Sequence, residues 1–232
     1  SNKATALPII ADHILKIAEF HGSWRGVIHT HSKANTRDLQ DHMRHLVRGR
    51  PDLKDRFIWH MGGPYREQMK RFLANPNDNR ILVSPSIAAG FDGKDRIARW
   101  QVIVKVPYPP TNDTAIKSKM NAPGGKTWYQ LEVVKTVGQM YGRVCRSDTD
   151  FGITYVADGG WSWFKKKCLA PDVWAQIPQM LQEAIANSSS FCYCYDEQGE
   201  LGQIPRPDWD LPENIGRESP VPSRHFLRNL TY

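Results

Sequence analysis

The chain is predicted to be an α/β protein, a three-layer sandwich in which a mainly parallel central sheet lies between two layers of helices. Five short runs rich in β-branched and aromatic residues alternate with segments whose apolar side chains recur at a helical period. One run, residues 100–106, is almost continuously apolar, as expected of a strand covered on both faces. Strands that alternate with helices favour parallel pairing through right-handed crossovers.

The composition is that of a globular protein. The 232 residues are 40% hydrophobic, and they contain no run of about 18 apolar residues, so no membrane partner is expected. The formal net charge of +7 favours a polyanionic partner. Cys145, Cys168, Cys192 and Cys194 lack the paired spacing of a zinc site, and we expect free thiols and no metal site. Ser1 and Asn2 resemble a scar left by tag removal, so we expect a fragment of a longer protein.

The first elements form a helix–strand–helix unit. Residues 4–20 have a helical apolar period, and residues 25–31 are a short β-branched strand. Ser32, just after this strand, can cap a helix that begins near residue 34. Strand, hydroxyl-rich turn and helix follow in the order of a parallel α/β unit.

The rest of the chain repeats this alternation. Further strands are predicted at residues 57–60, 81–84, 100–106 and 151–157, and further helices at residues 36–47, 65–73, 128–145, 161–167 and 171–186. Residues 111–126 form a polar connection. Residues 122–127 hint at a phosphate-binding loop, but Met120 stands where that pattern requires glycine, and we reject it. We expect one domain over residues 1–190 and an extension over residues 191–232, packed on the domain or on a missing partner domain.

The stretch at residues 139–146 reads Q-M-Y-G-R-V-C-R and carries two arginines at a useful spacing. If it is helical, one face presents Gln139, Gly142, Arg143 and Arg146. A pair of guanidinium groups beside a glycine can stabilise the charge that develops on a transferred γ-phosphate. An exposed basic helix face is the alternative reading.

The stretch extends through a serine, an acidic turn, D-F-G and a strand ending at Asp158. It resembles motif VI of superfamily 2 helicases, in the XPD/DinG-like group. Residues 84–93, S-P-S-I-A-A-G-F-D-G, resemble motif V, and the strand and turn at residues 26–33 resemble motif IV. All three occur in the family's order, and the resemblance covers residues 26–158. It implies the second, C-terminal RecA-like domain of a helicase, with a P-loop NTPase-type sandwich.

The resemblance also implies roles for individual residues. Catalytic positions are Arg143, Arg146 and Gln139; nucleotide-binding positions are Gly90, Asp92 and Gly142; nucleic-acid contacts are Thr30, Ser32, Lys33, Ser84 and Ser86. Gly90 would let the backbone approach a phosphate, and Asp92 would accept hydrogen bonds from a ribose or from the arginines. A plain helix cap is the alternative for Ser32. The glutamate that usually precedes the motif V glycine is replaced by Ala89.

The implied activity is ATP-driven translocation on single-stranded DNA. ATP and Mg²⁺ would be held in the full-length protein by the N-terminal RecA-like half, which also carries any iron–sulfur cluster, so this fragment alone is expected to be inactive and to bind no cofactor tightly. We expect a cytoplasmic location, or a nuclear one in a eukaryote. A catalytically inactive nucleic-acid-binding or scaffold module, or an RNA-directed helicase, remains as an alternative. The basic residues between positions 33 and 71 either line a nucleic-acid groove or are solvated.

Overall fold

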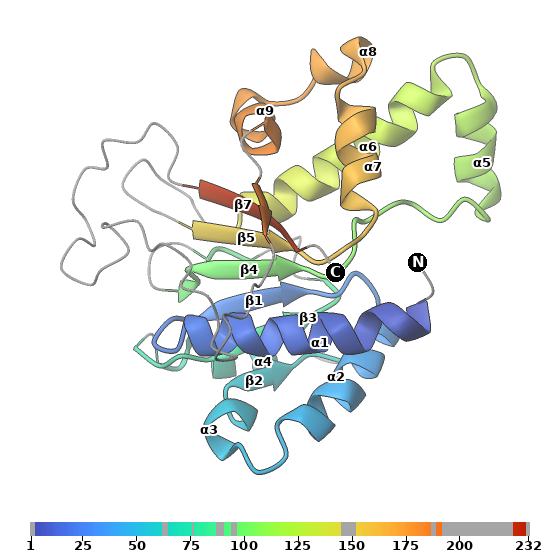
Figure 1. Ribbon diagram of the computed structural model, residues 1–232. Helices are drawn as coiled ribbons and strands as arrows, with labels where there is room; N and C mark the ends of the chain where they lie inside the picture. The colour runs from blue at the N-terminus through green and yellow to red at the C-terminus, as the bar shows by residue number, and fades with distance from the viewer. Residues whose placement is uncertain are drawn as a thin grey trace, which may run out of the picture.

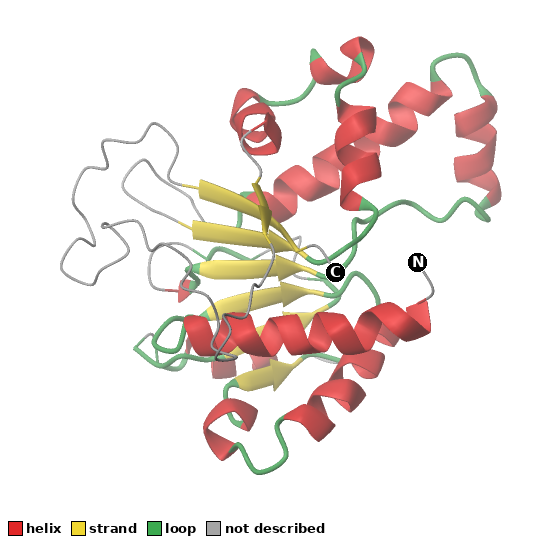
Figure 2. Ribbon diagram, in the orientation of Figure 1, coloured by secondary structure: helices red, strands yellow, loops and turns green. Residues whose placement is uncertain are grey.

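The chain folds as an α/β sandwich, which confirms the predicted class. The computed structural model describes residues 3–61, 65–75, 77–86, 91–93, 97–144, 152–186, 189–191 and 225–230. The strands form one twisted sheet, and helices lie on both of its faces (Figure 1, Figure 2).

Within the described residues, seven strands form the sheet in the order β2-β3-β1-β4-β5-β7-β6, and every pairing between them is parallel. The strands are β1 (Gly26–His29), β2 (Phe57–Trp59), β3 (Ile81–Ser84), β4 (Trp100–Ile103), β5 (Gly152–Val156), β6 (Ser189–Phe191) and β7 (His225–Leu230). The first five are the strands predicted from the sequence. Because β1 lies between β3 and β4, the turns that follow these three strands meet at one edge of the sheet.

Three helices cover one face of the sheet: α1 (Lys3–Phe20), α2 (Lys33–Leu46) and α3 (Pro51–Lys54). Their apolar side chains pack on alternate strand residues, among them Ile28, Trp100 and Tyr155. α2 begins where the sequence predicted, because the Ser32 hydroxyl accepts a hydrogen bond from the backbone N–H of Asn35 at 3.1 Å.

The other face is covered by α4 (Tyr65–Leu73), α6 (Gly125–Tyr141), α7 (Trp161–Cys168), α8 (Pro171–Trp174) and α9 (Gln179–Ala186). Ile103 and Val156 point into the layer formed by α6 to α9, and Phe72 of α4 packs in a separate cluster with Val27 and Leu82. α5 (Thr114–Asn121) packs beside α6 (Figure 1).

Several elements differ from the sequence prediction. Residues 114–121 form a helix within the expected polar connection, capped by the Asp113 carboxylate, which accepts hydrogen bonds from two backbone N–H groups at 2.9 and 3.2 Å. The single helix expected at residues 171–186 is two helices, because proline favours a helix start and Pro178 immediately precedes α9. α6 ends at Tyr141 rather than near residue 145.

The predicted C-terminal extension contributes β7 to the interior of the sheet. β7 pairs with β5 from Gly152↔His225 to Val156↔Asn229, and β6 pairs with its other side. The expected boundary near residue 190 stays a prediction. No helix in the described ranges is both long enough and apolar enough to cross a bilayer.

Candidate functional site

Several of the predicted nucleic-acid contacts gather where β1 and β3 end. His29 is paired with Ser84 across these neighbouring strands, and the backbone N–H of Thr30 donates to the Ser84 carbonyl at 3.1 Å. Ser32 and Lys33 follow β1, and Ser86 follows β3. The parallel sheet therefore brings the motif IV-like and motif V-like turns together at its carboxyl edge.

Burial divides these five residues into three groups. Thr30 and Ser84 are fully buried; the Thr30 hydroxyl is hydrogen-bonded to that of Thr36 at 2.5 Å, and the Ser84 hydroxyl to His60 Nδ1 at 2.7 Å. The half-buried Ser32 hydroxyl accepts the N–H of Asn35. The side chains of Lys33 and Ser86 are exposed. Thr30 and Ser84 thus hold the two turns in place, and Lys33 and Ser86 face solvent.

Two residues that the sequence did not single out complete this edge. His31 has a backbone φ of 66°, a left-handed conformation that is uncommon outside glycine. Burial, and then the positive charge of Lys105, lower the pKa of His31, so the imidazole is neutral near pH 7. Lys105 itself is exposed just beyond β4. The single cation in the apolar run at residues 100–106 was a usable signal for Lys105, whereas the conformation of His31 has no signature in the sequence.

A second group of predicted residues lies around Arg143. Its guanidinium Nη1 donates to the carbonyl of Phe91 at 2.7 Å, and its own carbonyl accepts the N–H of Gly93 at 2.9 Å. A Cβ atom at Gly93 would lie 2.4 Å from that carbonyl oxygen, so glycine is required for this approach. The exposed Asp92 stands between these two contacts. The structure therefore joins the Arg143 segment to the turn that carries Asp92.

The expected common helix face is wrong. α6 ends at Tyr141, Gly142 is its C-cap, and Arg143 lies in the following turn, with its N–H bonded to the carbonyl of Met140. The next residue, Val144, contacts Gly152 at the start of β5, and a Cβ at Gly152 would lie 2.7 Å from its carbonyl oxygen. Gln139 is exposed on α6, and Arg146 and Gly90 lie outside the described residues.

A row of buried polar side chains crosses the sheet beneath this turn. His29 Nε2 is 2.8 Å from Gln101 Oε1, and Gln101 Nε2 donates to the Thr154 hydroxyl at 2.7 Å and to the Tyr141 carbonyl at 3.2 Å. Since the Gln101 amide nitrogen donates to two acceptors, its oxygen accepts from His29, which places a proton on Nε2. The row ties the last residue of α6 to three strands. It thereby positions Arg143, which follows two residues later.

The charge state of His29 makes stability depend on pH. Burial, reinforced by the nearby Arg143 charge, lowers the pKa of His29 to about 4 from an ordinary 6.5. Between these values the unfolded chain binds a proton that the folded chain does not, so the free energy of unfolding decreases as the pH falls. We expect a loss of about 2 kcal/mol between pH 7 and pH 5, measured by urea unfolding.

Two single substitutions separate this effect from other titrations. His29→Gln keeps a donor but cannot titrate, so its stability should change less between pH 7 and pH 5 than that of the wild type. His45→Gln makes the same replacement at an exposed histidine of α2 and serves as the matched control. Equal pH dependence in His29→Gln and the wild type would rule out His29 as the cause.

Two buried arginines stabilise the fold: Arg56, which lies within the basic range 33–71, and Arg25, which precedes it. Arg56 is buried, and its guanidinium donates to four backbone carbonyls, those of Ala18, His21, Trp24 and Asn79. Arg25 is buried over the ring of Phe72 and 3.3 Å from Asp78. Arg56 and Arg25 are therefore not available to a ligand.

The chain is similar in sequence to known helicase domains. A family model described as "Helicase C-terminal domain" matches residues 21–182. The chain is 28% identical over 120 residues to a "Regulator of telomere elongation helicase 1 homolog" of Caenorhabditis briggsae, covering 46% of this chain and 11% of the relative. It is 23% identical over 137 residues to the "Regulator of telomere elongation helicase 1" of Mus musculus, covering 53% of this chain and 11% of the relative. The chain thus spans about a tenth of the length of these relatives.

Proposed function

Because the chain belongs to the family of helicase C-terminal domains, in the XPD/DinG-like group, we propose that it is the second motor domain of an ATP-dependent helicase that translocates on single-stranded DNA. The observation that carries this proposal is the contact between Arg143 and the turn at residues 91–93. The contact brings a cation and a carboxylate from distant parts of the sequence to one corner of the domain. A cation and a carboxylate in this arrangement can contact a nucleotide that is bound by a second domain.

In this proposal the arginines act on a nucleotide bound by the N-terminal half. ATP with Mg²⁺ would supply the phosphoryl group and the metal charge. Arg143 and Arg146 would stabilise charge on the γ-phosphate, and Gln139 would help to position it. Gly142 and Gly90 would permit close backbone approach, and Asp92 would hold the arginines or a ribose.

Two observations support this role for Arg143. Its guanidinium is partly buried and donates to the carbonyl of Phe91, and this contact orients the side chain. The polar row fixes the backbone just before it through the Tyr141 carbonyl. A guanidinium held in this way loses little further freedom when it meets a phosphate.

The carboxyl edge of the sheet is the proposed path of the DNA backbone. Lys33 and Ser86 are exposed there, and Lys105 adds a second cation. Ser32 contributes its turn at the start of α2, where backbone N–H groups favour an anion. Thr30 and Ser84 act indirectly, by holding the two turns together.

The test is ATP hydrolysis by the full-length protein with and without single-stranded DNA. We expect hydrolysis that DNA stimulates, and little stimulation by an RNA strand of the same sequence. Stronger stimulation by RNA would assign the protein to the RNA-directed class. No hydrolysis with either strand, together with retained DNA binding, would identify an inactive binding module, which the replacement of the usual glutamate by Ala89 would then explain.

A further inference from the structure

One face of α2 carries a stripe of basic residues that begins at the carboxyl edge of the sheet. Lys33, Arg37 and Arg44 are exposed at i, i+4 and i+11, spacings that repeat on one side of an α-helix. Gln40 lies between them, and the exposed Arg48 follows shortly after the helix ends. From Lys33 to Arg44 the stripe is about 16 Å long at the rise of an α-helix. It starts beside the proposed DNA contacts and leads away from them.

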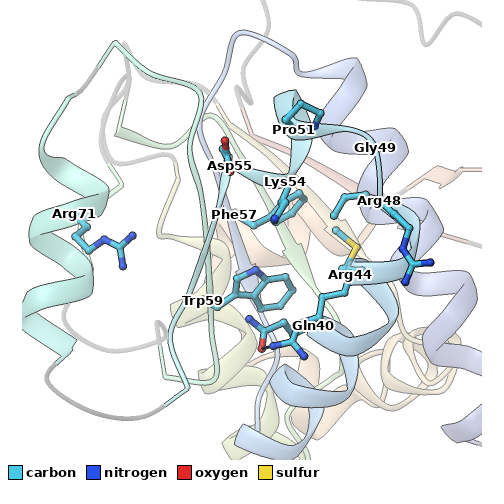
Figure 3. Close-up of a pocket in the computed structure, with 12 residues that line it drawn as sticks. Gln40, Arg44, Arg48, Gly49, Pro51, Lys54, Asp55, Phe57, Trp59 and Arg71 are labelled. Atoms are coloured by element: carbon cyan, nitrogen blue, oxygen red, sulfur yellow. Dashed lines mark hydrogen bonds between the residues drawn. The ribbon is translucent and has the colours of Figure 1, made fainter.

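The stripe ends in a groove at the β2 edge of the sheet. The groove has a volume of about 690 Å³ and lies between α2, α3 and α4. We call it the edge groove and define it by Arg44, Arg48, Lys54, Trp59 and Arg71, with Asp55 as its acidic member. In Figure 3, Arg71 points toward the groove from α4 and Arg44 approaches it from α2, and Arg48 lies in the turn that follows α2. Four cations and one carboxylate give this groove a positive charge.

The cations of the groove are available to an external anion. Among the described residues, no carboxylate lies within ion-pairing distance of Arg48, Lys54 or Arg71. Arg44 is paired with Asp41 at 3.0 Å, but both side chains are more than half exposed, and such pairs contribute little. If a phosphate replaced Asp41 as the partner of Arg44, the cost in free energy would therefore be small.

The groove also presents an aromatic ring. Trp59 is half-buried at the end of β2, and its ring stacks on that of the buried Phe57, with centroids 5.9 Å apart and planes 26° apart. Figure 3 shows the Trp59 ring beside Gln40 and Arg44. Nucleic-acid grooves that tolerate any sequence combine cations along the backbone path with an aromatic ring on which a base stacks.

We propose that the edge groove is a second contact for single-stranded DNA, reached along the basic stripe of α2 from Lys33. A base stacks on Trp59, and Arg48, Lys54 and Arg71 bind the adjacent phosphates. The inference rests on the proposed function, from which the identity of the ligand, single-stranded DNA, is taken. It adds an outer contact that none of the motif-like turns includes. The combination of a half-buried aromatic ring with cations favours a nucleic acid over an acidic peptide, which has no base to stack.

The test measures binding of a fluorescent oligothymidine of about 12 nucleotides to the chain by anisotropy, at two salt concentrations. Arg48→Gln with Arg71→Gln should weaken binding and lower the slope of log K against log salt by about 1.4, since each phosphate contact to a single strand contributes about 0.7. The matched control is Lys117→Gln with Lys135→Gln, which removes the same charge from exposed positions on α5 and α6. This control should leave the slope near the wild-type value.

The aromatic contact is tested separately. Trp59→Leu should weaken binding about 5- to 100-fold, whereas Trp59→Phe, which keeps a ring, should restore most of the affinity. Thermal unfolding of each variant shows whether the fold is intact. The proposal is overturned if the double arginine variant binds the oligonucleotide as tightly as the lysine control does. It is also overturned if an acidic peptide binds the groove and the oligonucleotide does not. Because ATP is absent, either result is independent of the proposed motor activity.

Discussion

Arg146→Ala in the full-length protein is expected to abolish ATP hydrolysis and to leave DNA binding largely intact. An arginine that stabilises charge on a transferred phosphoryl group is worth about three to five orders of magnitude in rate. Arg143→Ala should have an effect of the same kind, because Arg143 is held against the turn that carries Asp92. The measurement is steady-state hydrolysis with saturating single-stranded DNA, together with DNA binding by anisotropy.

Two further variants make this experiment specific. Arg143→Lys keeps the charge but loses the planar fork of donors, so it should also be strongly impaired. Arg66→Ala removes an exposed arginine of α4 and should hydrolyse ATP at the wild-type rate. Hydrolysis near the wild-type rate in Arg146→Ala would refute the assignment of these arginines.

Trp100→Ala is expected to cause a large loss of stability, of about 3–5 kcal/mol. Trp100 is fully buried at the start of β4, and its indole N–H donates to the Trp24 carbonyl at 3.4 Å. Its ring stacks with that of His21 at 5.7 Å and fills the space over Gly26, where a Cβ atom would lie 2.2 Å away. Alanine would leave a cavity between α1 and the sheet. Urea unfolding measures the change in the free energy of unfolding.

The same substitution at an exposed tryptophan is the control. Trp163 of α7 is 48% exposed, and its ring contacts Tyr108 at 5.1 Å. Trp163→Ala should therefore cost about 1 kcal/mol or less. Similar losses in the two variants would contradict the packing described for Trp100.

Local patterns predicted much of the fold. The first five strands are short β-branched runs whose burial on both faces follows from parallel pairing, and the cap at Ser32 is a local interaction. β7 was not predicted, because its place between β5 and β6 depends on pairing with residues far away in the sequence. The break before α9 had a local signal in Pro178, which the apolar period of residues 171–186 obscured.

The candidate site was predictable in part. The sequence associated Arg143 with Asp92, and the structure places their segments in contact. The sequence did not indicate that Thr30 and Ser84 are buried. A hydroxyl residue at the end of a strand gives the same sequence pattern whether its side chain contacts a ligand or a neighbouring side chain. Gln101 lies within an apolar strand, and its link between His29 and the end of α6 appears only when three strands and a helix are assembled.

The most direct measurement is the rate of ATP hydrolysis by this chain mixed with the separately produced N-terminal half, with single-stranded DNA present. Each half alone should be inactive, the mixture should hydrolyse ATP, and a mixture made with the Arg143→Ala chain should not. Hydrolysis by this chain alone, or equal rates in the two mixtures, would contradict the proposal that this domain supplies arginines to a nucleotide bound by its partner half.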